Sequence, residues 1–185
     1  MKVLGPTLTS IAILLTVMLP GTAVAADSVF LKLDNIEGES TAVGHEKEIV
    51  LLSYTQSFTR AGGSGGGGAA AGKADCGAIT VTKLLDRSSP ALMGAVMSGQ
   101  VIPNGVITFR KEGKQPLEYY KVTLTNVLIQ SISQTDASPT DPTTVLEQIS
   151  MSAGRFKFEY VTQGATGQAQ GGLTFSWDCL ANTPG

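Results

Sequence analysis

A single histidine is the first candidate for chemistry in this sequence. His45 is followed by Glu46, and these residue types can bind a metal or transfer a proton. Zinc generally needs three or four ligands, and a catalytic triad needs a nucleophile and an orienting acid beside the histidine. Neither set accompanies His45 at a recognisable spacing. We therefore expect His45 to be a solvated loop or capping residue, and we predict neither a metal site nor an enzyme.

Three carboxylates cluster just before this histidine, at Asp34, Glu37 and Glu39. A glycosidase holds two such groups on either side of a cleft. Closeness along the chain does not create that arrangement, and acidic residues are common in turns. An exported hydrolase is therefore the weakest of three functional hypotheses.

A glycine-rich stretch contains the spacing of a phosphate-binding loop in Gly67, Gly72 and Lys73. The next residue is Ala74, which lacks the hydroxyl that binds Mg²⁺ in such loops. A phosphate-binding loop also opens a helix, whose N-terminal amides hold the anion. Alternating β-branched residues follow here instead and predict a strand. We expect no nucleotide and no other cofactor.

The start of the chain has the pattern of an export signal. Lys2 is followed by an apolar run over residues 11–19 and by small residues at 23–25, as a signal peptidase requires. The run is too short to span a bilayer, and an uncleaved anchor is the alternative. We predict a signal peptide over residues 1–25. The remaining single domain, 26–185, would be secreted or periplasmic and would not contact the membrane.

Two cysteines remain in the mature chain, Cys76 and Cys179. Because exported proteins meet an oxidising compartment, an even pair favours one disulfide. Such a bond would close a loop over most of the domain and stabilise it by about 4–5 kcal/mol. The alternative is two unpaired thiols on separate strands.

Charge and length narrow the class of protein. The formal net charge is −2, and it becomes −3 when Lys2 is removed. This weak acidity argues against nucleic acid or an anionic membrane as a partner. The mature chain of about 160 residues suits one domain with a substantial core.

The elements that position these groups are strands, because apolar and polar residues alternate along most of the chain. In the longest strand the apolar phase shifts near Asn126, which predicts one extra residue at a bulge or barrel corner. The expected strands lie around residues 29–33, 49–60, 79–82, 107–109, 117–133, 144–151, 155–160 and 173–178.

One segment has helical periodicity instead. Ser89 can cap this helix, Pro90 suits its first position, and Gly99 can supply the left-handed end. Many short strands with one helix predict a mainly β fold, a small β-barrel or two-sheet sandwich with the helix packed at its side. The stripe expected to face the core consists of Leu92, Met93, Val96 and Met97.

Several stretches carry a resemblance when they are taken in order along the chain. They are residues 36–40 with His45 and 52–54, then 82–92, 119–124, 156–160, and 177–178 with Asn182. Together they resemble the haemolysin-coregulated protein (Hcp) family, the tube-forming proteins of type VI secretion, and they cover nearly all of the mature chain.

The resemblance implies a β-barrel that forms hexameric rings, and rings that stack into the inner tube of an injection machine. It also implies a spike protein and effector cargo as partners. In this family the loop between the second and third strands reaches towards a neighbouring ring. By position, the candidate stacking residues here are Gly62, Gly63, Ser64, Gly65, Lys73 and Asp75.

Two hypotheses of function therefore stand ahead of the hydrolase. The first is a structural, ring-forming subunit that is secreted and carries effectors. The alternative is a secreted Hcp-like binding or virulence module that does not form tubes. The signal peptide favours the alternative, because tube proteins act from the cytoplasm and usually carry no cleavable signal.

Overall fold

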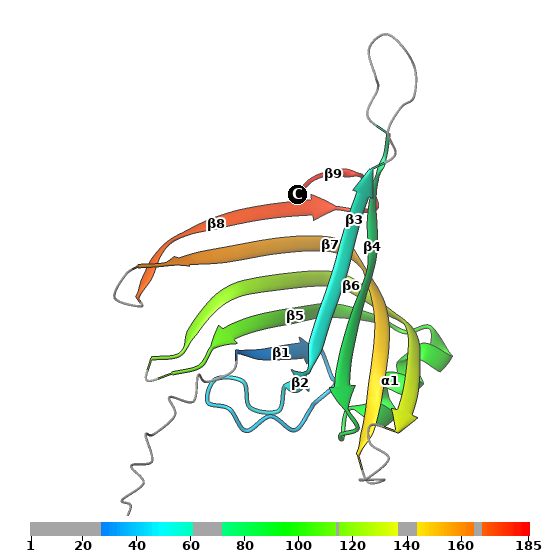
Figure 1. Ribbon diagram of the computed structural model, residues 1–185. Helices are drawn as coiled ribbons and strands as arrows, with labels where there is room; N and C mark the ends of the chain where they lie inside the picture. The colour runs from blue at the N-terminus through cyan, green and yellow to red at the C-terminus, as the bar shows by residue number, and fades with distance from the viewer. Residues whose placement is uncertain (1–26, 61–71, 114, 137–143, 165–167) are drawn as a thin grey trace, which may run out of the picture.

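The computed structural model describes residues 27–60, 72–113, 115–136, 144–164 and 168–185. Strands account for most of these residues, and one helix lies among them, as the sequence predicts. Figure 1 shows the arrangement. The elements are β1 (Ser28–Leu33), β2 (Ile49–Leu51), β3 (Ser53–Arg60), β4 (Ala74–Leu84), α1 (Ser89–Ser98), β5 (Val101–Lys111), β6 (Leu117–Asp136), β7 (Val145–Gln163), β8 (Ala169–Asp178) and β9 (Thr183–Pro184).

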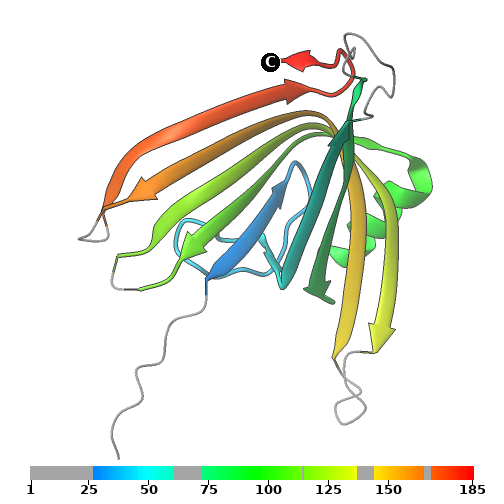
Figure 2. The same cartoon turned by 45° about the horizontal axis from the view of Figure 1, so that its top comes forward.

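The strands form one antiparallel sheet in the order β2-β1-β5-β6-β7-β4-β3. The two ends of this order are separated in sequence only by Leu52, whose N–H donates to the carbonyl of Thr82 at 2.8 Å. The sheet therefore curls into the expected barrel-like fold. Figures 1 and 2 show β3 and β4 running across the stacked strands β1, β5, β6 and β7.

The sheet forks at β7, because this long strand has different neighbours along one edge. Its first half, to Met151, pairs with β4, and its second half, from Arg155, pairs with β8. The other edge pairs with β6 from Val145 to Tyr160. The sequence predicted two strands, over 144–151 and 155–160, and this was wrong: a single strand of 19 residues spans both. The segment predicted as one strand over 49–60 divides at Leu52 into β2 and β3.

A corner crosses the sheet at Asn126, where the sequence predicts a change of face. Leu124 and Val127 are both buried, so the inward phase shifts between them, and Asn126 adopts a left-handed φ of 55°. Pro103 and Gly154 lie opposite Asn126 in the neighbouring strands, and the pairs on either side keep one register. All three strands therefore turn together. The expected extra residue is not here but between Ile129 and Ser131.

Helix α1 packs against β6 beside the barrel (Figure 1). Gly99 ends it with a φ of 65°, as the sequence predicts. The N-cap is Ser88 rather than Ser89. Leu92 is fully buried, but Met97 is 88% exposed, so the expectation that it faces the core was wrong. Within the described ranges, no helix combines the length and apolar character that crossing a membrane requires.

A buried ion pair fastens the start of α1 to the barrel. Lys83 and Glu147 are fully buried, with Nζ 2.7 Å from the Glu147 Oε2. Ser89 donates its hydroxyl to the same carboxylate at 2.6 Å, and Gln134 donates to the other oxygen at 2.8 Å. Burial alone would raise the pKa of Glu147, but hydrogen bonds from Lys83, Ser89 and Gln134 hold it below its usual value. The hydroxyl of Ser89 is thus already hydrogen-bonded within this network, which explains why it does not cap the helix.

Candidate assembly surfaces

His45 has a structural setting rather than a catalytic one. Its ring stacks on Phe30 with centroids 4.2 Å apart and planes 4° apart. Nδ1 lies 2.8 Å from Oε2 of Glu48, and Nε2 lies 3.4 Å from Oε1 of Glu118. His45 is only 4% exposed, so the expectation of a solvated side chain was wrong. Its ring stacking and its contact with Glu48 hold the loop that leads into β2.

The three clustered carboxylates make separate surface contacts. Glu37 pairs with Lys47 at 3.2 Å and with Arg87 at 3.3 Å. Asp34 accepts a hydrogen bond from the side chain of Asn104 at 2.8 Å. Glu39 accepts the backbone N–H of Arg87 at 3.1 Å. Each carboxylate therefore has its own polar contact rather than a partner across a cleft. In the described part of the chain, no three His, Cys, Asp or Glu residues are placed to hold a metal ion.

The glycine-rich stretch falls mostly outside the described residues, which exclude Gly62, Gly63, Ser64, Gly65 and Gly67. Lys73 is followed at once by β4, so an extended strand stands where a phosphate-binding loop would open a helix. Asp75 lies inside β4 and pairs with Thr59.

A disulfide between Cys76 and Cys179 joins the start of β4 to the segment after β8, with Cα atoms 6.1 Å apart. The N–H of Cys179 also donates to the carbonyl of Gly154 at 2.9 Å. The amide side chain of Asn182 contacts both backbone groups of Ala74, at 3.4 and 3.3 Å. The end of the β3–β4 hairpin is therefore attached to the C-terminal strands at two neighbouring points.

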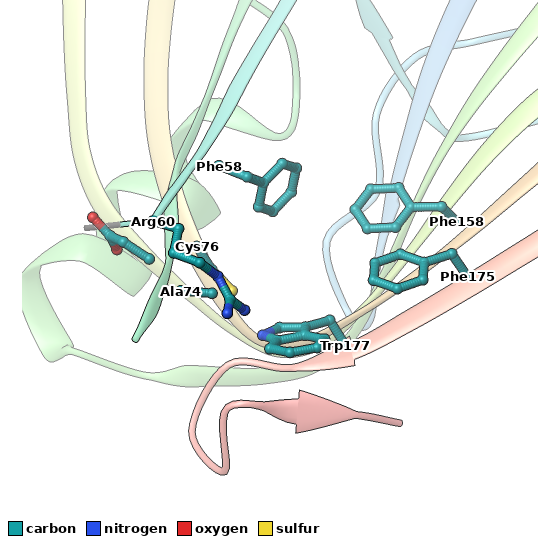
Figure 3. Close-up of a pocket in the computed structure, with 8 residues that line it drawn as sticks. Phe58, Arg60, Ala74, Cys76, Phe158, Phe175 and Trp177 are labelled. Atoms are coloured by element: carbon teal, nitrogen blue, oxygen red, sulfur yellow. The ribbon is translucent and has the colours of Figure 1, made fainter. Parts of the chain in front are cut away.

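An apolar groove lies beside this attachment, between the β3–β4 hairpin and strands β7 and β8 (Figure 3). We call it the aromatic groove. Phe58 meets Phe158 edge-on with centroids 5.6 Å apart, and Phe175 stacks between Phe158 and Trp177 at 6.2 and 6.3 Å. The groove is lined by Phe58, Arg60, Ala74, Asp75, Cys76, Phe158, Phe175 and Trp177.

The aromatic groove is largely uncovered. Phe58 is 51% exposed and Phe175 is 55% exposed. Strand β8 pairs with β7 on one edge, and β9 covers only Trp177 and Asp178 on the other. In the described residues, the rest of that edge has no strand partner. Exposed apolar patches and open strand edges are typical of surfaces that contact another protein.

A second exposed apolar surface lies at the opposite end of β4. We call it the aliphatic patch. Its side chains are between 45% and 56% exposed. The acidic residues Glu39 and Asp86 line the same hollow. The apolar residues of the aliphatic patch are Val50, Leu52, Leu84 and Leu85.

Comparison with known proteins identifies the family. The family model described as "Type VI secretion system effector, Hcp" matches residues 30–160. The chain is 32% identical to the protein hcp1 of Pseudomonas aeruginosa over 160 residues, which is 85% of this chain and 98% of that protein. The chain belongs to the Hcp family.

Solved Hcp structures share the fold of this Hcp chain. A type six secretion system protein has a TM-score of 0.81 at 26% identity, over 86% of this chain and 100% of the other. Hcp1 from Salmonella typhimurium has a TM-score of 0.69 at 30% identity, over 86% of this chain and 99% of the other. As a member of this family, the protein is a ring- and tube-forming subunit of type VI secretion. Proteins of the family are structural tube components that this system secretes.

Sequence reasoning found the strands that line the aromatic groove of this Hcp chain but did not find the groove. Alternation placed Phe158 and Phe175 on apolar faces, as it did for Phe156. The available signal was the run of aromatic residues at alternate positions in two neighbouring strands. Together these side chains present more apolar surface than the core of one small barrel can bury.

Proposed function

We propose that this Hcp chain assembles into a hexameric ring and that the rings stack into a tube. The observation that carries the proposal is the exposure of β8, on which Leu173 is 71% exposed and Phe175 is more than half exposed. A ring needs apolar surfaces that one copy leaves open and a neighbour covers. Hexameric rings are the form that the family takes.

Light scattering coupled to size exclusion tests this proposal on residues 26–185 with the cysteines oxidised. We expect the mass of a hexamer. A monomer at tens of micromolar would contradict the ring and favour the secreted module that does not form tubes.

We propose that residues 1–25 are a signal peptide and that the mature protein is secreted or periplasmic. The apolar run and the small residues before Ala26 support this. Mass spectrometry of the exported protein should find Ala26 at its N-terminus. An intact N-terminus on the exported protein would contradict cleavage.

The route of secretion separates the tube subunit from the alternative module. Secretion that stops when the type VI machine is deleted supports a tube component, for which a spike protein and effector cargo are the proposed partners. Secretion that persists in that deletion, but stops when residues 1–25 are removed, supports the alternative. The signal sequence and the cysteine pair favour this second candidate, because both suit an oxidising compartment.

We propose two further roles for residues named from the sequence. The segment that includes Gly62, Gly63, Ser64, Gly65 and Lys73, with Asp75 at the start of β4, contacts the next ring, so shortening the part before β4 should abolish tubes while hexamers remain. Cys76 and Cys179 form a disulfide in the mature protein, and Ellman's reagent on denatured, non-reduced protein should detect no free thiol. Two free thiols would contradict the bond.

A further inference from the structure

The aromatic groove and the aliphatic patch lie at opposite ends of one strand. β4 begins at Ala74 beside the groove and ends at Leu84 within the patch. A strand of 11 residues separates its ends by roughly 30 Å, because each residue advances about 3.3 Å. The chain therefore presents two different exposed apolar surfaces on opposite sides.

The aromatic groove carries two hydrogen-bond donors, on Arg60 and Trp177, that have no protein acceptor among the described residues. Figure 3 shows the guanidinium of Arg60 extended towards Trp177. Among the described residues, no carboxylate lies within ion-pair distance of Arg60, which is exposed at the end of β3. The indole Nε1 of Trp177 is buried and also lacks a partner within the described ranges. A buried indole N–H usually finds an acceptor. Asp75 also lines the groove, but the Nε1 of Trp177 is left for an acceptor from a second molecule.

The aliphatic patch carries the opposite charge. Glu39 is exposed at its rim, where the backbone N–H of Arg87 donates to one of its carboxylate oxygens. In the part of the chain that the structure describes, Glu39 has no basic side chain within ion-pair distance, whereas its neighbour Asp86 pairs with Lys83 at 2.7 Å. The patch therefore offers protruding aliphatic side chains and one carboxylate without a cation.

We propose that the aromatic groove of one copy receives the aliphatic patch of a second copy, with Arg60 facing Glu39. The inference rests on the proposed assembly and names the two surfaces that join. Branched aliphatic side chains fill spaces between aromatic rings, and the acidic rim meets the guanidinium. Such a contact joins two different patches head to tail, which is the kind of interface that closes rings.

Charge also argues against the alternative of joining like surfaces. A contact of patch with patch would bring Glu39 of each copy towards the other, and Asp86 lines the same hollow. A contact of groove with groove would leave the aliphatic patch uncovered and Glu39 without a cation. Like charges brought together across an interface oppose association, so the pairing of unlike surfaces is favoured.

Charge reversal tests the pairing by light scattering at one concentration. We expect Arg60→Glu and Glu39→Arg each to shift the mass from the assembly to the monomer. An equal mixture of the two variants should recover the assembly, because alternating copies place opposite charges at positions 60 and 39 in every contact. Recovery on mixing also shows that neither variant is misfolded. Lys32→Glu, which reverses an exposed cation on β1, is the matched control and should assemble like the wild type.

The single tryptophan of the sequence supplies a second readout, because it lies in the aromatic groove. Its fluorescence should shift to shorter wavelength on assembly and should do so again when the two variants are mixed. Single reversals that assemble like the wild type would overturn the pairing while leaving the proposed ring intact. Monomeric variants that do not recover on mixing would also overturn it. A wild-type protein that is itself monomeric would overturn the ring and the pairing together.

Discussion

The two halves of β7 have similar alternation but very different surroundings. In the first half the inward residues Glu147, Ile149 and Met151 are fully buried between β6 and β4. In the second half, between β6 and β8, Tyr160 is 45% exposed although it belongs to an equally apolar face. Alternation thus reports which face is apolar, and it does not report whether anything covers that face. In a tube subunit, the uncovered half is the part that a neighbouring copy can complete.

One row of paired residues shows the same change across the sheet. Leu31, Ile107 and Val122 lie side by side in β1, β5 and β6 and are fully buried. The row continues through Phe158 to Phe175, which is more than half exposed. The barrel covers one end of the row and leaves the other open.

We call the first half of β7 with β4 and β6 the closed half, and the second half of β7 with β8 the open half. The largest expected effect comes from separating the open half from the β3–β4 hairpin. Replacing both Cys76 and Cys179 with Ala should lower the free energy of unfolding by about 4–5 kcal/mol, because the bond closes a loop of about 100 residues. Urea denaturation measures the loss. Hydrogen exchange should show that β8 opens more than β1. Equal stability of the variant and the oxidised wild type would contradict this expectation.

The closed half should be most sensitive at its buried ion pair. Lys83→Met leaves the carboxylate of Glu147 buried without its cation, which should cost about 3–5 kcal/mol in urea denaturation. The double variant Lys83→Met/Glu147→Leu is the matched control and should recover most of the loss, because no buried carboxylate remains at position 147. A single variant as stable as the wild type would show that the pair does not hold this half together.

Two phenylalanines in adjacent strands show how sharply burial changes between the second half of β7 and its neighbour β8. Phe156→Ala should cost about 3–5 kcal/mol because the ring is fully buried. Phe175→Ala should lower the free energy of unfolding of the monomer by under about 1 kcal/mol, because the ring is already half exposed. The same Phe175 variant should weaken assembly strongly in light scattering. Equal costs for the two variants in denaturation would contradict the contrast.

The smallest expected effect is the pH dependence of the closed half. The pKa of Glu147 is lower in the folded state than its usual value near 4.5, so its contribution to stability is complete above that pH. The contribution is lost as the pH falls through the folded-state pKa, and each unit of depression corresponds to about 1.4 kcal/mol. Urea denaturation below pH 4.5 should show a steeper loss for the wild type than for Glu147→Gln. Parallel curves would contradict the assignment.

The fold was predictable because its signals are local. Val29, Leu31 and Leu33 alternate in a way that is typical of a strand, and Gly99 ends the helix where its left-handed backbone is needed. The buried setting of His45 was not predictable, because Phe30 and Glu118 approach it from strands distant in sequence. The role of Ser89 was missed for the same reason, since its partner Glu147 lies 58 residues away.

The amino-acid sequence alone was sufficient to predict the alternation of apolar and polar residues along the strands, the family and the positions of the charged residues in the chain. Those properties depend on neighbours along the chain, so they can be inferred without knowledge of the fold. Three features required the folded chain: β7 has two kinds of neighbour, Lys83 meets Glu147, and Arg60 and Glu39 stand at opposite ends of β4. Burial and pairing depend on which distant strands come into register, and the period of a single strand carries no information about that register.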